Sequence, residues 1–132
     1  MNETRYGYEK VLDGISMETA RARVVTALAA EGFGVLTEID VTATLKKKLD
    51  VGFRPYVILG ACNAQLAHQA LEAEPQIGLL LPCNVVLQGG TGGVAVSIAN
   101  PKAMFEIVGN PALDPVVRDA DTRLRRVFDA LW

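Results

Sequence analysis

The apolar stretch of residues 56–62 organises the expected fold. Residues 56–59 are Tyr-Val-Ile-Leu without a polar residue, the pattern of a strand that is covered on both faces in the middle of a sheet. We therefore predict a strand over residues 53–61, with Pro55 at its entrance, and expect it to be the central strand. Asn63 is a strong N-cap, and Leu66 and Ala70 belong to the apolar stripe of a helix that ends before Pro75.

Four further strands are predicted. Residues 5–12 show a strand-like pattern, and residues 33–41 alternate between an apolar and a more polar face. Residues 83–88 and 94–99 flank the turn Gly89-Gly-Thr-Gly-Gly93 and predict a hairpin. The glycines also invite comparison with a phosphate-binding loop, but such a loop leads into a helix and this one leads into a strand, so we favour the hairpin.

Helical signals occupy the rest of the chain. Ser16 can cap a helix that ends at Gly32, and Thr42 can cap a short helix. Asn100-Pro101 begins a helical turn, and Asp114 is expected to be the N-cap of the last helix, with Pro115 at its first position. The last helix has an apolar face and a mixed-charge face, on which we place Arg118, Asp119, Asp121, Arg123, Arg125, Arg126 and Asp129. Residues 77–81 are expected to form a buried extended connection. The predicted order is β-α-β-(short α)-β-α-β-β-α, an α+β fold with a single, mainly antiparallel or mixed sheet of about five strands packed against helices.

Composition and charge limit the classes of protein. The chain has 132 residues, half of them apolar, which fits one domain over residues 1–132. A net charge of −2 argues against a nucleic-acid partner. The run Lys46–Lys48 is expected to be a solvated flank, although it could also collect an anionic ligand.

The expected location is the cytoplasm. The N-terminal ten residues carry charges where a secretory signal needs an apolar segment. The longest apolar run, residues 77–87, is interrupted by Pro82 and Asn84 and is shorter than the roughly 20 residues of a membrane-spanning helix, so no membrane partner is expected. In a reducing compartment the two cysteines should be thiols.

The candidate site is built on Cys62 and Cys83. Cys62 ends a predicted strand just before a helix N-terminus, where backbone N–H groups and the helix dipole favour a thiolate. Cys83 begins another strand, on the face shared by Val85 and Leu87. If the two strands are neighbours, the thiols could form a redox pair, a sulfur-carrying site or two soft metal ligands. The alternative is that both are small buried apolar side chains, because no Lys or Arg is adjacent in sequence to lower either pKa.

Three other residues near the cysteines are weighed with them. His68 is a weak candidate ligand in a metal site with Cys62 and Cys83, but the spacings match no standard zinc pattern, and an exposed His68 paired with Glu72 is preferred. Asn63 and Asn84 are expected to satisfy backbone groups and are also placed in the ligand-binding set. No cofactor can be named.

The motifs Leu59-Gly-Ala-Cys-Asn63, Glu74-Pro-Gln-Ile-Gly78 and Leu79-Leu-Leu-Pro-Cys-Asn84 resemble the family called domain of unknown function 302. Both Cys-Asn pairs occur at the family's positions, although Ala64 stands where the family usually has proline. The resemblance covers nearly the whole chain and implies a small α+β fold and a homodimer, without an established activity.

We therefore expect a cytoplasmic homodimer, with a small-ligand-binding or accessory role and a site formed by Cys62, Asn63, Cys83 and Asn84. The dimer is also expected because the helices predicted here cover only one face of an apolar sheet. The alternative is a thiol-dependent redox, sulfur-handling or soft-metal-binding protein that uses Cys62 and Cys83. Whether the protein is an enzyme stays open, since no Ser-His-Asp set, carboxylate pair or nucleotide-binding motif is visible.

Overall fold

The computed structural model describes residues 2–131 and contains one antiparallel sheet with helices, the predicted α+β class. Its strands are β1 (Asn2–Glu3), β2 (Gly7–Asp13), β3 (Gly34–Asp40), β4 (Tyr56–Cys62), β5 (Cys83–Gly90) and β6 (Gly93–Ala99). They lie side by side in the order β1-β2-β6-β5-β4-β3, and every neighbouring pair is antiparallel. The glycine-rich turn joins β5 to β6 as the predicted hairpin.

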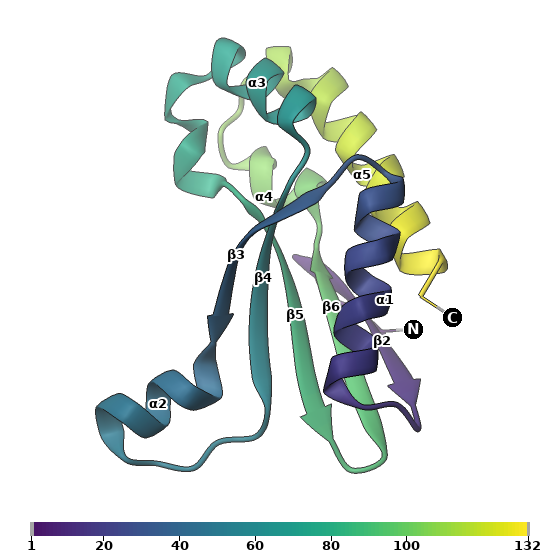
Figure 1. Cartoon of the computed structure of the whole chain (residues 1–132). Coiled ribbons are helices and arrows are strands. Elements are labelled where there is room, and N and C mark those ends of the chain that lie inside the picture. The colour runs from purple at the N-terminus through teal and green to yellow at the C-terminus, as the bar shows by residue number, and fades with distance from the viewer. Residues whose placement is uncertain (1, 132) are drawn as a thin grey trace.

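Two helices cover one face of this sheet (Figure 1). They are α1 (Met17–Ala30) and α5 (Asp114–Asp129), which contribute Val24, Leu28, Leu124 and Val127 to the main core. The strands supply alternate residues, as the pleat requires, and Val85, Leu87, Val94, Val96 and Ile98 are buried beneath the helices. Phe128 completes this core with its ring edge-on to that of Tyr8.

A second, smaller core lies at the end of the sheet where α3 (Ala64–Ala73) and α4 (Pro101–Glu106) are seen in Figure 1. The 3₁₀ helices η1 (Pro75–Leu80) and η2 (Pro111–Leu113) close it. Its buried members are Leu66, Ala70, Ile77, Phe105, Leu113, Val116 and Ala120. Because Val116 and Ala120 belong to the first half of α5, this helix contributes to both cores.

The face of the sheet opposite α1 and α5 is only partly buried. Ile39, Ile58 and Val86 form one cross-strand row on it, since the register pairs Ile39 with Ile58 and Ile58 with Val86. Ile58 and Val86 are half-buried, Ile39 is 49% exposed, and Val11 on β2 is 47% exposed. We call the face that carries these four residues the open face.

The short helix α2 (Val41–Leu49) lies at the other end of the sheet from α3 (Figure 1) and has no buried residue. Its N-cap is Asp40, whose side chain accepts a hydrogen bond from the Ala43 N–H, so the prediction of Thr42 as the cap was wrong. The Thr42 hydroxyl instead donates to the Arg54 carbonyl at 2.7 Å and so ties the loop after α2 to the helix. Lys46 to Lys48 occupy the exposed last turn of α2, in agreement with a solvated flank.

Four further expectations were wrong. Strand β4 is not central, since only β3 separates it from the sheet edge and one of its faces is the open face. Residues 77–81 are not extended, because residues 75–80 form η1 with Pro75 in its first turn. Asp121 does not lie on the solvent face of α5, where it is 4% exposed. Asp114 is not the N-cap of α5, because its backbone is already helical and the cap position is Leu113, which makes no side-chain cap bond. Ser16 and Asn63 are the N-caps of α1 and α3, as expected.

Candidate functional site

Cys62 and Cys83 lie on neighbouring strands but are not cross-strand partners. The register between β4 and β5 pairs Cys83 with Ala61, and the register between β3 and β4 pairs Cys62 with Gly34. Successive side chains of a strand point to opposite faces, so this one-residue offset directs the two thiols apart. Both cysteines are free, and the expected contact between them across the strands is not formed.

Both cysteines nevertheless border the same cavity. It has a volume of about 30 Å³ and lies where the two cores meet, because its walls come from both. The lining is almost entirely apolar and consists of Phe33, Ala61, Cys62, Asn63, Leu66, Ala67, Ala70, Leu81, Cys83, Phe105, Val116 and Ala120. This space fits a water- or methyl-sized group, and a larger ligand requires a wall side chain to move.

The environment of the thiols opposes ionisation. Burial raises the pKa of Cys62, even though this residue ends β4 directly before α3 as predicted. Burial, with a smaller contribution from the charge of Cys62, raises the pKa of Cys83 to about 11. A thiolate is the nucleophilic form of cysteine, so neither residue is activated by this arrangement at neutral pH.

Asn63 has a structural function in the folded chain. It is 9% exposed, its Oδ1 accepts a hydrogen bond from the Leu66 N–H at 3.2 Å, and its Nδ2 donates to the Glu31 carbonyl at 3.3 Å. It therefore caps α3 and ties that helix to the end of α1, as its sequence position indicated.

Asn84 lies apart from the other three candidate residues. It is exposed on β5 and does not border the cavity between the cores. It lines a second cavity of about 40 Å³ with Cys83, Pro101, Met104 and Phe105. The structure thus brings Cys62, Asn63 and Cys83 to one cavity, and the cavity beside Asn84 shares Cys83 and Phe105 with it.

His68 lies on the exposed side of α3, away from the cysteines. Its Nε2 is 3.3 Å from Oε1 of Glu72, with about three quarters of each side chain exposed, which confirms the preferred interpretation of this pair. Among residues 2–131 no cluster of three or more His, Cys, Asp or Glu side chains is suited to hold a metal ion.

A buried polar cluster was missed by the sequence analysis. The Tyr8 hydroxyl donates to Oδ1 of Asp121 at 2.6 Å, and Arg125 Nε donates to Oδ2 at 3.1 Å. Lys102 Nζ lies 3.4 Å from the same Oδ2, and the Arg125 guanidinium lies 4.6 Å from the centre of the Tyr8 ring. The cluster joins β2, α4 and α5 at the boundary of the main core.

Helical periodicity could have located this cluster. Asp121 follows Val117 by four residues and precedes Leu124 by three, so it belongs to the apolar stripe of α5 and not to its charged face. A carboxylate on an apolar stripe needs partners, and Tyr8 is a suitable buried donor. Tyr8 and Asp121 are 113 residues apart in sequence, so no local pattern could pair them.

Comparison with known proteins agrees with this fold. A family model described as "Domain of unknown function DUF302" matches residues 8–131. The chain belongs to the DUF302 family. A crystal structure described as an uncharacterized conserved DUF302 protein from Bacillus stearothermophilus is 30% identical to the chain and superimposes with a TM-score of 0.86, covering 96% of this chain and 98% of that one.

Family membership confirms the resemblance drawn from the two Cys-Asn motifs, and it carries no activity. No curated protein matches this DUF302 chain. Within residues 2–131 there is also no helix with the length and apolar character needed to span a bilayer.

Proposed function

We propose that this DUF302 chain is a single cytoplasmic domain that acts as a homodimeric binding or accessory protein. The observation that carries the proposal is the open face of the sheet. A sheet with one face under α1 and α5 and an apolar row of Ile39, Ile58 and Val86 on the other gains stability when a second surface covers that row. Two unpaired thiols are in keeping with a reducing compartment.

The second copy of the chain is the partner that fits the open face. The row of Ile39, Ile58 and Val86 continues through Ser97 to Glu9 on β2, so it changes from apolar to polar toward that side of the sheet, as interfaces commonly do at their rim. Two sheets can pack face to face at about 10 Å, with interdigitating side chains.

Sedimentation equilibrium at micromolar concentration tests the dimer. Wild-type protein should sediment at twice the chain mass, and Ile58→Lys should give monomers with unchanged far-ultraviolet circular dichroism, because the charge has no partner in an apolar interface. Leu71→Lys is the matched control, since Leu71 is an exposed apolar residue of α3 and not of the sheet. A wild-type monomer, or equal effects of both variants, contradicts the proposal.

For the ligand, we propose the neighbourhood of Cys62, Asn63, Cys83 and Asn84. The supporting observation is the apolar cavity at the junction of the cores, with two thiols and one amide as its few polar groups. Sites for small molecules combine an apolar lining with a few polar groups in this way. The preformed space is small, so a ligand enters as Leu81 or Phe105 moves.

A variant that fills the cavity tests this site. Ala67 lines the cavity and is half-buried, so Ala67→Leu should reduce its volume, whereas Ala22→Leu adds the same atoms to an exposed position of α1. Native mass spectrometry of protein purified from cells should show a bound molecule in the wild type and in Ala22→Leu, and its loss in Ala67→Leu. Protein free of any bound molecule contradicts the ligand site.

The alternative function is thiol-dependent redox, sulfur-handling or soft-metal chemistry at Cys62 and Cys83. The raised pKa of each thiol weighs against it. Alkylation of the native protein followed by mass spectrometry separates the two functions, because a working Cys62 reacts well below pH 8.5. If zinc or copper ions prevent alkylation of the cysteines, the two thiols are metal ligands. His68→Ala then tests whether the histidine belongs to the same metal site. Absence of native modification ends the thiol alternative.

A further inference from the structure

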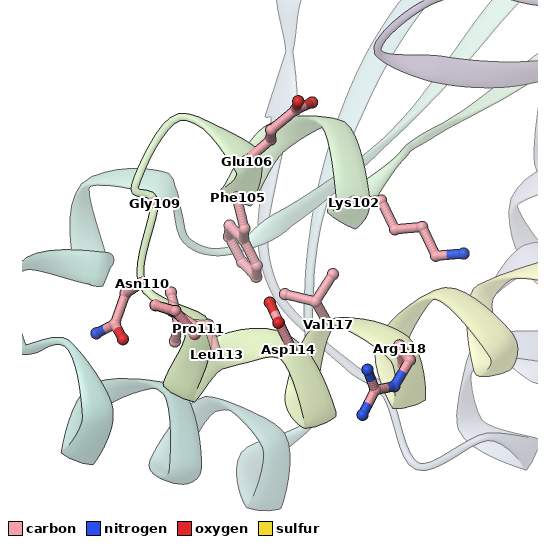
Figure 2. A pocket seen from close by; sticks show the side chains of 10 residues that line it. All are labelled: Lys102, Phe105, Glu106, Gly109, Asn110, Pro111, Leu113, Asp114, Val117 and Arg118. Carbon is pink, nitrogen blue, oxygen red and sulfur yellow. The ribbon is translucent and has the colours of Figure 1, made fainter.

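A cleft on the surface between α4 and α5 has the features of a second binding site. The cleft has a volume of about 460 Å³ and is formed by α4, the loop of residues 107–110, η2 and the first turns of α5 (Figure 2). This volume lies within the range typical of small-molecule sites, and it is an order of magnitude larger than the cavity beside the cysteines.

The base of the cleft is apolar. Phe105 and Leu113 are almost completely buried, and Val117 is half-buried between them and solvent. In Figure 2 the ring of Phe105 and the side chain of Val117 both point toward the middle of the cleft. An aromatic or aliphatic group of a ligand can therefore cover these side chains and lose its own contact with water.

Two cations lie at one end of the cleft. Figure 2 shows Lys102 and Arg118 on the same side, away from the end formed by Asn110 and Pro111. Within residues 2–131 the Arg118 guanidinium makes no hydrogen bond or ion pair, whereas Arg123 and Arg125 on the same helix are each paired with a carboxylate. Arg118 keeps its planar set of donors available to an incoming carboxylate.

Lys102 is also able to contact a ligand. Its Nζ lies 3.4 Å from Oδ2 of Asp121, but that oxygen already accepts a hydrogen bond from Arg125, and the other oxygen accepts one from Tyr8. More than half of the Lys102 side chain is exposed, so its ammonium group can also donate toward the cleft. The cleft therefore has two donors of positive charge beside an apolar base.

The two acidic residues of the rim limit where an anion can bind. In Figure 2 the Glu106 carboxylate points outward from the cleft, while Asp114 points toward Phe105 from the first turn of α5. A ligand carboxylate is repelled by Asp114 and attracted by Lys102 and Arg118, which fixes its orientation along the cleft. An ammonium group on the same ligand would instead be favoured near Asp114.

From this geometry we propose that the cleft binds a small organic carboxylate with an apolar body. The carboxylate contacts Arg118 and Lys102, and the apolar body covers Phe105 and Val117. The site does not depend on the dimer or on the proposed ligand at Cys62 and Cys83, although Phe105 also lines that cavity.

Binding of 3-phenylpropanoate to the purified full chain, followed by protein-observed NMR and by calorimetry, tests the proposal. The expected result is saturable binding with shifts in α4 and in the first half of α5. The neutral amide of the same acid should bind at least about tenfold more weakly, because one charge-assisted hydrogen bond is worth about a factor of ten or more. Added salt should weaken binding of the acid and leave binding of the amide nearly unchanged. Phenylalanine, which adds an ammonium group, reports whether Asp114 takes part.

Two variants with a matched control locate the site. Arg118→Gln should weaken binding of 3-phenylpropanoate about tenfold, and Val117→Asn should weaken binding of both the acid and the amide. Arg23→Gln should change neither, since Arg23 is an exposed arginine of α1 outside the cleft. Any of three results overturns the proposal. They are no detectable binding at a ligand concentration of about 10 mM, equal affinity for the acid and the amide, and equal loss of affinity in Arg118→Gln and Arg23→Gln.

Discussion

Removing the Tyr8 hydroxyl should destabilise the fold far more than the loss of one oxygen suggests. In Tyr8→Phe the Asp121 carboxylate loses its hydrogen bond at 2.6 Å, a length typical of a charge-assisted O–H···O⁻ bond. Tyr8 is 2% exposed and Asp121 is 4% exposed, so water cannot replace the hydroxyl without opening the core. A hydrogen bond to a charged group is worth about 1.5–3 kcal/mol, and we expect the loss in free energy of unfolding to fall in that range.

Urea unfolding at pH 7 measures this loss. A change of that size should lower the urea midpoint by about 1 M without changing the slope of the transition. Tyr6→Phe is the matched control, because Tyr6 is 68% exposed and its loss of a hydroxyl should change stability by less than about 0.5 kcal/mol. If Tyr8→Phe is no more destabilising than Tyr6→Phe, the bond between Tyr8 and Asp121 contributes nothing and the reasoning is refuted.

The same cluster predicts a dependence on pH. Burial alone would raise the pKa of Asp121, but the hydrogen bonds from Tyr8 and Arg125, with the charges of Arg125 and Lys102, outweigh burial and lower it. A lowered pKa in the folded state means that the carboxylate contributes its full stability above the unfolded pKa of about 4. The difference in stability between wild type and Asp121→Asn should therefore be constant from neutral pH to about pH 5 and shrink as the pH falls below about 4. A difference that grows on acidification contradicts this assignment.

Three other changes test separate features of the fold. Gly60→Ala should destabilise by about 1–3 kcal/mol in thermal unfolding, since its Cβ would lie 2.7 Å from the ring of Pro82, and an unchanged melting temperature would refute this contact. Asn63→Ala should cost about 1 kcal/mol in thermal unfolding by removing the cap on the Leu66 N–H, and an unchanged melting temperature would count against capping. Cys83 should be alkylated in the native protein only as the pH approaches its pKa of about 11, which a pH series followed by mass spectrometry can check, and rapid reaction at pH 8 would contradict the effect of burial.

Local signals located the elements of this fold, and long-range contacts decided what the sequence could not. The Ser16 and Asn63 caps, the glycine-rich hairpin and the periodicity of the last helix depend on neighbours in sequence, and each was predicted. The position of β4 in the sheet was not predicted. A strand next to the edge of a sheet can have the same apolar sequence as a central strand when the sheet has an apolar open face.

In the candidate site, too, the sequence predicted the local contacts and not the long-range ones. The cap formed by Asn63 and the pair of His68 with Glu72 follow from spacing along α3. The separation of the thiols does not, since it depends on a register in which Cys83 opposes Ala61, and a shift of one residue reverses the direction of a side chain. The cleft of Figure 2 joins two helices whose contact no local pattern specifies.

The two edges of the sheet bear on how the protein behaves when it is concentrated. A long, regular edge strand is a template for aggregation, because its unpaired backbone groups can bind another strand. On one side the edge strand β1 has two residues. On the other, β3 is interrupted by a register shift between Val35 and Thr37, and its Glu38 is held by Arg21 from α1. Growth of the sheet into a fibre by strand addition is therefore disfavoured at both edges, which leaves contact between faces as the way for two such sheets to meet.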